Sequence, residues 1–191
     1  LAASYLAKGD LNNAMRTFQR GLELFPNELD LNTNLAKLYM AQAPNKGTAS
    51  LTKAILLLEK VCRLRPEQWE FHDLLGQAYN MRGDLDAAFT AYDQACQLVG
   101  SVELCHWRKI LVLLDQRKSD AAKEELNSVQ TTEAHSPYFL YASAEVARQQ
   151  GDLSSARQWL EKIDVAQVSD QALARKIERL KSSLVFSEID F

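Results

Sequence analysis

Apolar residues recur at helical spacing along most of the chain, and the clearest stretch is 69–100, WEFHDLLGQAYNMRGDLDAAFTAYDQACQLVG. Small and apolar residues stand at this spacing on both sides of a Gly83-Asp84 pair: Leu75, Gly76 and Tyr79, then Ala88, Tyr92 and Ala95. A glycine followed by an aspartate is typical of a point where one helix ends and the next begins. The stretch therefore predicts two helices joined by a tight turn. One such hairpin cannot bury its apolar face alone, so the pattern is expected to repeat.

The same landmarks do recur at a fixed period. Gly9, Gly83 and Gly151 are separated by 74 and 68 residues, which is two periods of 34 plus a six-residue insertion, and then two periods. The insertion falls near residues 43–48, where Pro44 and Gly47 predict a turn or loop. This loop is either a tolerated surface insertion or a partner-contacting edge. The residues expected to cap the following helices are Asp10, Asp84 and Asp152, with Ser50 in the stretched repeat.

The pattern resembles the tetratricopeptide repeat, in which W-x-x-L-G-x-x-Y, then A-x-x-x-F, then an alanine and a final proline recur about every 34 residues. In this chain His72 stands where that family has its tryptophan. The resemblance implies an all-α fold, a right-handed α-solenoid of helix-turn-helix repeats.

We expect a single repeat domain over residues 1–191. Its repeats are a partial one at about 1–28, a stretched one at 29–68, and three more at 69–102, 103–136 and 137–170. A final amphipathic segment, 171–186, is predicted to be a capping helix that covers the apolar end of the stack. The chain begins inside a helical motif and without an initiator methionine, so we expect a fragment of a longer protein.

Composition and charge exclude several classes of partner. The net charge is −3 with mixed signs and no basic block, so nucleic acid is not expected as a partner. The longest apolar runs, 54–58 and 110–114, are far shorter than the roughly 20 residues that cross a bilayer, and we expect no membrane insertion. The odd count of three cysteines favours a reducing compartment such as the cytoplasm, with a bacterial periplasm as the alternative.

No sequence motif for catalysis or cofactor binding occurs, so we expect a protein that is not an enzyme and has no cofactor. His72 and His106 lie one period apart, with Cys105 beside the second, which would suit a metal pair. Both histidines stand at the position of the family's tryptophan, so we interpret them as helix-packing residues and expect no metal site. Cys62 and Cys96 share another repeat position, which is typical of small core residues.

The resemblance also implies where a partner would bind, because the first helix of each repeat lines the concave face in that family. The expected partner-binding residues are Asn34, Lys37 and Asn80 in a polar half, and Trp107, Arg108, Tyr138, Tyr141 and Arg148 in an aromatic half. Tryptophan, tyrosine and arginine most often dominate interface energetics. A one-residue shift in the irregular fourth repeat would instead turn Trp107 inward as a packing residue. A clamp for acidic C-termini is not expected, since Glu70 and Leu74 occupy the places of its cationic pair.

The sequence therefore predicts a non-catalytic adaptor or scaffold that binds a partner protein or peptide in its concave groove. A bacterial envelope or secretion assembly is one setting for such a scaffold. Two alternatives stay open. The chain is a regulatory region of a larger enzyme, or it self-associates through its first repeat, where Leu1 and Leu6 are expected to be uncovered.

Overall fold

The computed structural model describes residues 1–99, 103–129 and 136–186, and within these ranges every regular element is a helix. Side chains are described throughout these ranges except at 45–46, 103–105 and 185–186. Residues 100–102, 130–135 and 187–191 lie outside the described residues. The chain divides into two compact units, Leu1–Ser101 and Val102–Phe191. The all-α class predicted from the sequence is confirmed.

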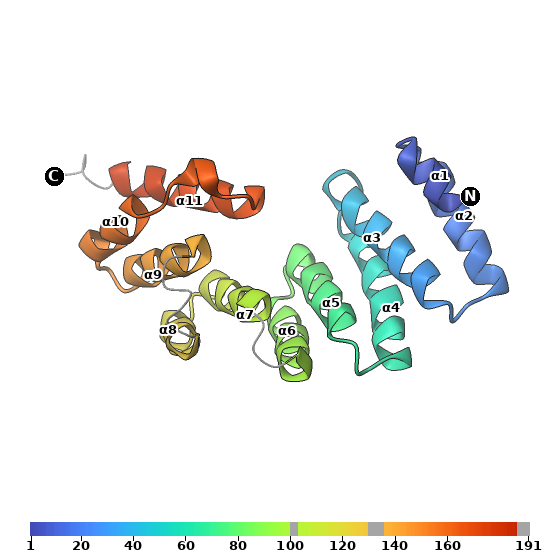
Figure 1. Ribbon diagram of the computed structural model, residues 1–191, viewed down its shortest axis with the longest axis horizontal. Helices are drawn as coiled ribbons and strands as arrows, with labels where there is room; N and C mark the ends of the chain where they lie inside the picture. The colour runs from blue at the N-terminus through green and yellow to red at the C-terminus, as the bar shows by residue number, and fades with distance from the viewer. Residues whose placement is uncertain (100–102, 130–135, 187–191) are drawn as a thin grey trace. The chain divides into compact units, whose positions relative to one another are not determined.

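The first unit is a stack of three helical hairpins (Figure 1). Their helices are α1 (Ala2–Ala7) with α2 (Leu11–Leu24), α3 (Leu29–Lys46) with α4 (Thr48–Leu64), and α5 (Trp69–Arg82) with α6 (Leu85–Val99). Successive hairpins pack through α2 against α3 and through α4 against α5. This is the nearest-neighbour packing of a helical repeat array.

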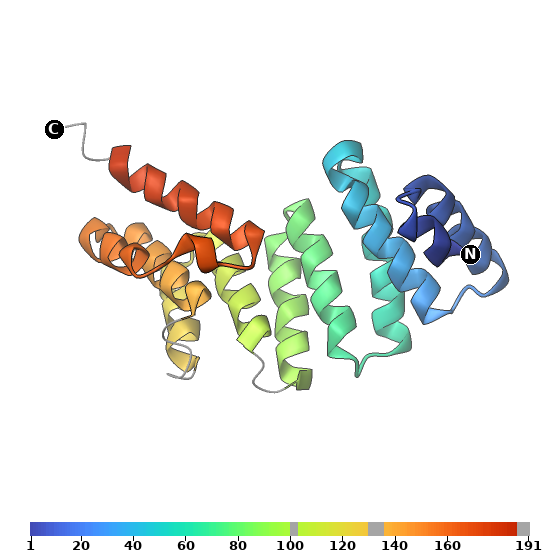
Figure 2. The ribbon, with the colours of Figure 1, turned by 45° about the horizontal axis from the view of Figure 1, so that its top comes forward.

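The second unit contains two hairpins and a final helix (Figure 2). Its elements are α7 (Glu103–Asp115), α8 (Ser119–Ser128), α9 (Pro137–Gln149), α10 (Leu153–Glu161), the short 3-10 helix η2 (Val165–Gln167) and α11 (Gln171–Phe186). Pro137 opens α9, where its missing N–H removes no helical hydrogen bond. The final helix packs against α10 and α9.

The turns inside the hairpins share one backbone geometry. Gly9, Gly83 and Gly151 have φ of 71°, 91° and 85°, a left-handed conformation that favours glycine. In the fourth repeat Arg117 takes the same role with φ of 58°, and it lies 34 residues from both Gly83 and Gly151. The turn of this irregular repeat therefore keeps the period although it lacks the glycine.

Two of the expected helix caps form hydrogen bonds. The Asp10 carboxylate accepts from the Asn13 amide at 3.1 Å, and the Asp152 carboxylate accepts from the Ser155 amide at 2.9 Å. Hydrogen bonding from the side chain of the capped residue, Asn13 or Ser155, and then from its backbone N–H holds the pKa of both carboxyls below the ordinary value. The Asp84 carboxylate forms an ion pair with Arg82. Ser50 is not a cap, because it lies buried inside α4.

The six-residue insertion does not form the expected loop. Helix α3 continues through Pro44 to Lys46, and Gly47 alone, with φ of 67°, separates it from α4. The inserted residues therefore lengthen the two helices of this hairpin. The missing N–H of Pro44 costs one backbone hydrogen bond, which a helix ending two residues later tolerates. The prediction of a loop is wrong at these residues, since only a one-residue turn at Gly47 interrupts the helices. Contact of this edge with a partner stays a prediction.

Candidate protein-binding surface

In the first unit, three of the predicted binding residues present polar side chains to solvent. Asn34 and Lys37 lie on α3 and Asn80 lies on α5, each on the first helix of its hairpin. Lys37 is exposed, and the two asparagines are half-buried. Within the described part of the chain, none of the three forms a side-chain hydrogen bond or ion pair. Their amide and ammonium groups are therefore available to an external acceptor or donor.

In the second unit, Trp107 points inward. Its side chain is 1% exposed, and its ring stacks on Tyr138 with centroids 6.0 Å apart and planes at 16°. Phe139 meets the same indole edge-on at 6.3 Å. Trp107 is therefore a packing residue, as the alternative register predicted, and its ring stacks on the ring of Tyr138.

Tyr138 connects α9 to the start of α11. Its hydroxyl donates to the Asp170 carboxylate, which also accepts from the backbone amides of Ala172 at 2.8 Å and Leu173 at 3.2 Å. Asp170 is thus the N-cap of α11 and its tie to α9. The bond from Tyr138, then the two amides and the nearby positive charge of Arg108, hold the pKa of Asp170 below its ordinary value.

Tyr141 lies one helical turn further along α9 and is 7% exposed. It belongs to one hydrophobic cluster with residues of α10 and α11, among them Leu173, Ile177 and Leu180. Burial, followed by the negative charge of Glu145, raises the pKa of the Tyr141 phenol, so the group stays neutral across the physiological range. Tyr141 thus belongs to the surface that α11 packs against, which we call the α11 seat and which includes Tyr138, Tyr141 and Leu160.

Arg148 is committed to a neighbour on its own helix. Its guanidinium forms an ion pair with Glu145, and the Glu145 carboxylate also accepts from Gln149 at 3.0 Å. The hydrogen bond that the Arg148 guanidinium donates to Glu145 raises the pKa of Arg148. The Gln149 amide donates further to the carbonyl of Leu114 at 2.9 Å, which joins α9 to α7. This network lies beside Tyr141 at the edge of the α11 seat.

Two residues of the predicted aromatic half, Tyr138 and Tyr141, belong to the same hydrophobic cluster as the apolar residues of α11. Helix α11, a segment of the same chain, lies along α9 and α10 (Figures 1 and 2). Lys176 of α11 reaches Asp115 at the end of α7 with Nζ and Oδ2 3.2 Å apart. Sequence reasoning missed three contributors, Asp115, Asp170 and Lys176. Asp170 could have been found as a cap before an amphipathic segment. The Asp115–Lys176 pair could not, because its members are 61 residues apart and meet only when α11 docks.

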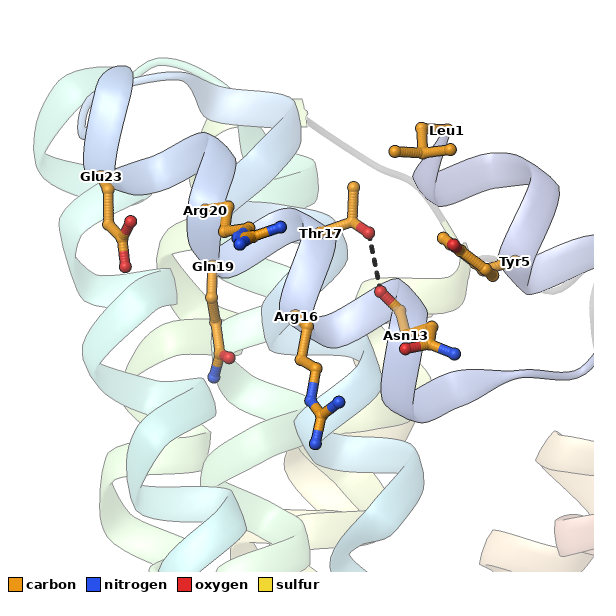
Figure 3. A pocket seen from close by; sticks show the side chains of 8 residues that line it. All are labelled: Leu1, Tyr5, Asn13, Arg16, Thr17, Gln19, Arg20 and Glu23. Atoms are coloured by element: carbon orange, nitrogen blue, oxygen red, sulfur yellow. Dashed lines mark hydrogen bonds between the residues drawn. The ribbon is translucent and has the colours of Figure 1, made fainter.

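A shallow hollow of about 400 Å³ lies between α1 and α2 (Figure 3). Its lining residues are Leu1, Tyr5, Asn13, Arg16, Thr17, Gln19, Arg20 and Glu23. The Thr17 hydroxyl donates to the carbonyl of Asn13 at 2.7 Å, within α2. The hollow is open and polar, whereas small-molecule and catalytic sites are usually enclosed and largely apolar.

The two histidines considered for a metal site make contacts within the fold. His72 is buried, with Nε2 3.0 Å from the carbonyl oxygen of Pro66. His106 Nδ1 lies 2.7 Å from Glu125, which also pairs with Lys109 at 3.2 Å. Among the described residues, no group of three or more potential ligands is placed to hold a metal ion. The side chain of Cys105 lies outside those described.

Of the cysteines, Cys62 is free and buried, and burial raises the pKa of its thiol to about 11. It is therefore an unreactive core thiol, as expected. Cys96 is also buried but is disulfide-bonded, which corrects its interpretation as a simple core residue. No helix in the described ranges is long and apolar enough to cross a membrane.

Comparison with known proteins is consistent with this architecture. A family model described as "Tetratricopeptide repeat" matches residues 47–101 and 108–172, and a second model with that description matches residues 1–28. None of the curated proteins matches the chain significantly.

Similar solved structures include MamA, with 21% identity, a TM-score of 0.72, and coverage of 96% of this chain and 97% of that one. YrrB, described as a TPR protein with an unusual peptide-binding site, has 16% identity, a TM-score of 0.68 and coverage of 93% and 88%. PilW, described as a type IV pilus biogenesis factor, has 16% identity, a TM-score of 0.66 and coverage of 97% and 86%. At these identities the likeness is one of fold.

Proposed function

Because this chain belongs to the tetratricopeptide repeat family, we propose that it is a non-catalytic scaffold that holds a segment of a partner protein on the first helices of its hairpins. Repeat arrays of this kind serve as protein-interaction modules, and the function lies in the exposed faces of their helices. In the first unit that face includes α3 and α5.

The observation that carries the proposal is the set of uncommitted side chains on these two helices. Asn34, Lys37 and Asn80 have no hydrogen-bonding or ionic partner in the described part of the chain. An asparagine amide donates and accepts, so it can bond a partner's backbone, while a lysine can pair with a carboxylate. Met81, which is 48% exposed on α5, adds apolar area beside them.

Two similar structures support a peptide as the bound element. YrrB is described as having a peptide-binding site, and PilW as a factor in pilus biogenesis, which is an assembly process. By analogy, this chain would bind a peptide segment within an assembly.

The test is a selection of peptide ligands for the wild-type chain from a random displayed library, followed by affinity measurements on variants. The variant Asn34→Ala/Lys37→Ala/Asn80→Ala is expected to weaken the selected peptides about tenfold or more, because truncating interface side chains typically costs 1 kcal/mol or more at the positions that matter.

The matched control places three substitutions on second helices, Thr52→Ala and Lys53→Ala on α4 and Gln94→Ala on α6, all at exposed residues. It should leave the affinity unchanged, and circular dichroism should show both variants folded. Equal affinity of the first variant and wild type for every selected peptide would remove α3 and α5 as the binding face.

Self-association is a second candidate function, favoured by apolar side chains exposed on the first hairpin. Leu1, which precedes α1, and Leu6 on α1 are exposed, and so are Leu24 and Phe25 at the end of α2. Apolar side chains exposed together often mark an interaction surface. Light scattering over a concentration series tests this candidate, and a monomer at all concentrations would exclude it.

A further inference from the structure

We infer that α11 is a displaceable internal ligand, and that the partner of the second unit is an amphipathic helix that takes its place across α7 and α9. The inference rests on the proposed function and adds the kind of segment that is bound. A helix lying with its apolar face in a groove is one of the recurring modes of peptide recognition.

The first argument is where α11 lies. Although α11 packs against α10 and α9, the polar side chains that bond the start of the helix come from α7 and α9, the first helices of their hairpins and the elements predicted to receive a partner. Tyr138 donates to Asp170 at the start of the helix, and Asp115 pairs with Lys176 two turns further on. These are contacts at recognition positions, made by a segment of the same chain.

The second argument is the apolar seat. The buried residues of α11 are Leu173, Ile177, Leu180 and Leu184, which fall on one face at alternating spacings of four and three. On the opposing side, all eight residues of α9 from 140 to 147 are buried. This part of α9 therefore exposes no face to which a partner could bind. Residues of α11 pack in one hydrophobic cluster with Tyr141 of α9.

The third argument is that a described polar contact between α11 and α7 is partly exposed to solvent. In the Lys176–Asp115 pair the side chains are 35% and 42% exposed, and such pairs contribute little net stability. The ties to the second hairpin are Arg157, which donates to the carbonyl of Leu184 at 3.0 Å, and Lys181, which donates to the carbonyl of Ile163 at 3.2 Å. A competing helix with the same apolar face could replace them.

The seat specifies the chemistry of the occupant. The partner helix begins at an acidic cap that meets Tyr138 and carries a basic residue six positions later, opposite Asp115. Its apolar residues follow the cap by 3, 7, 10 and 14 positions, as in α11. A peptide with this pattern should compete with α11 in proportion to the fraction of time that the seat is vacant.

The probe is a fluorescent synthetic peptide of residues 169–186, added to the full chain and followed by anisotropy. The variant Asp170→Ala/Lys176→Glu weakens only the internal helix and leaves the seat intact. It removes the cap and places a glutamate opposite Asp115. We expect this variant to bind the peptide about tenfold more tightly than wild type, since a lost cap and a reversed ion pair together release the seat.

Two controls locate the effect. Arg179→Glu makes the same charge reversal on the exposed side of α11 and should match wild type. Adding Asp115→Lys to the weakened variant should lower its affinity for the wild-type peptide, and a peptide carrying Lys176→Glu should restore it. A scrambled peptide of equal composition should not bind.

Displacement is read separately by hydrogen exchange with a heavy-isotope peptide. Binding of the peptide should speed exchange of the amides of α11. The inference is overturned if the peptide binds no variant, if binding ignores Asp115→Lys, or if α11 stays protected when the peptide is bound. It is also overturned if the Asp170→Ala/Lys176→Glu variant dimerises and does not bind the peptide, because a second copy of the chain would then occupy the α11 seat. The peptides selected on α3 and α5 test the proposed function independently, so either idea can fail alone.

Discussion

Asp170 joins the start of α11 to α9 through its carboxylate. It caps α11 through two backbone amides and accepts a hydrogen bond from Tyr138 across 32 residues of sequence. Because all three donors favour the ionised carboxylate, its pKa is lowered on folding. A lowered folded pKa stabilises the docked helix above the unfolded pKa, near 3.8, and that contribution is lost as the pH falls through the folded value.

Tyr138→Phe should therefore raise the pKa of Asp170 toward its ordinary value, because it deletes the largest of the stabilising hydrogen bonds while keeping the ring on Trp107. A carbon-detected NMR titration of the Asp170 carboxyl measures this directly. The Asp152 carboxyl, which is also a helix cap but has no tyrosine partner, serves as the internal control. An unchanged titration midpoint for Asp170 would show that the hydroxyl does not bond it.

Gly76 shows how one position is fitted to its neighbour. A Cβ added there would lie 2.5 Å from two ring atoms of Tyr92, closer than packing allows. The equivalent positions pair a slightly larger residue with a smaller one, Ala36 with Leu58 and Ala144 with Leu160. The absence of a side chain at Gly76 thus leaves room for the larger ring of Tyr92.

Gly76→Ala should destabilise the protein by about 1 kcal/mol, because the overpacking cost of roughly 1–3 kcal/mol is only partly offset by the gain in helix propensity of about 1 kcal/mol. Gly76→Ala/Tyr92→Leu should recover most of the loss, since it recreates the pairing of the sister repeats. Urea unfolding of the single and double variants measures both values. A stabilised Gly76→Ala variant would contradict the packing argument.

At the scale of elements, the turns explain why an irregular repeat still folds in register. Lys118 precedes α8 with φ of −92° and ψ of 64°, close to the −86° and 80° of Asp152 before α10. The backbone is shaped for a capping side chain, and the lysine supplies no cap hydrogen bond. The fourth repeat therefore keeps the backbone geometry of a helix N-cap but has no capping side chain at that position.

Lys118→Asp should stabilise the protein by about 1 kcal/mol relative to Lys118→Ala, through a hydrogen bond from the amide of Ala121. Lys118→Ala is the proper reference, because both variants lack the interactions of the lysine side chain and differ only in the capping carboxylate. Thermal unfolding at neutral pH measures the difference. Equal melting temperatures for the two variants would mean that the cap does not form.

Elements also mark a limit of reasoning from residue types. Pro44 and Gly47 predict a loop, yet α3 runs through the proline to Lys46. The period of 34 correctly located the six extra residues. It could not say whether they form a loop or longer helices, because that depends on whether the added helical turns find neighbours to pack against.

At the scale of the whole molecule, each unit has its own hydrophobic cluster. One involves α2 to α6, including Phe18, Leu58 and Leu75, and the other involves α9 to α11, including Leu160 and Ile177. Repeat arrays open locally because each hairpin is stabilised only by its neighbours. A perturbation should therefore stay within its unit.

Hydrogen exchange of Gly76→Ala tests this locality. The variant should exchange faster over α5 and α6, while the amides of α10 and α11 keep their wild-type protection. Ile177→Ala provides the reciprocal case in the second unit, where its 0% exposed side chain leaves a cavity. Uniform acceleration across both units would indicate one cooperative array.

The sequence by itself determined the hairpins, their period, the final amphipathic helix and two of the caps, because these depend on spacing and on backbone chemistry within one or two turns. It also predicted Tyr138 and Tyr141 as residues of a partner-binding face, which stays a prediction. Only the tertiary structure decided that Trp107 points inward and that α11 packs against the helix that carries the two tyrosines. Those facts depend on contacts between residues 31 to 61 positions apart, such as Trp107 with Tyr138 and Asp115 with Lys176. A helical pattern specifies which residues share a face, and the packing of neighbouring helices decides what that face meets.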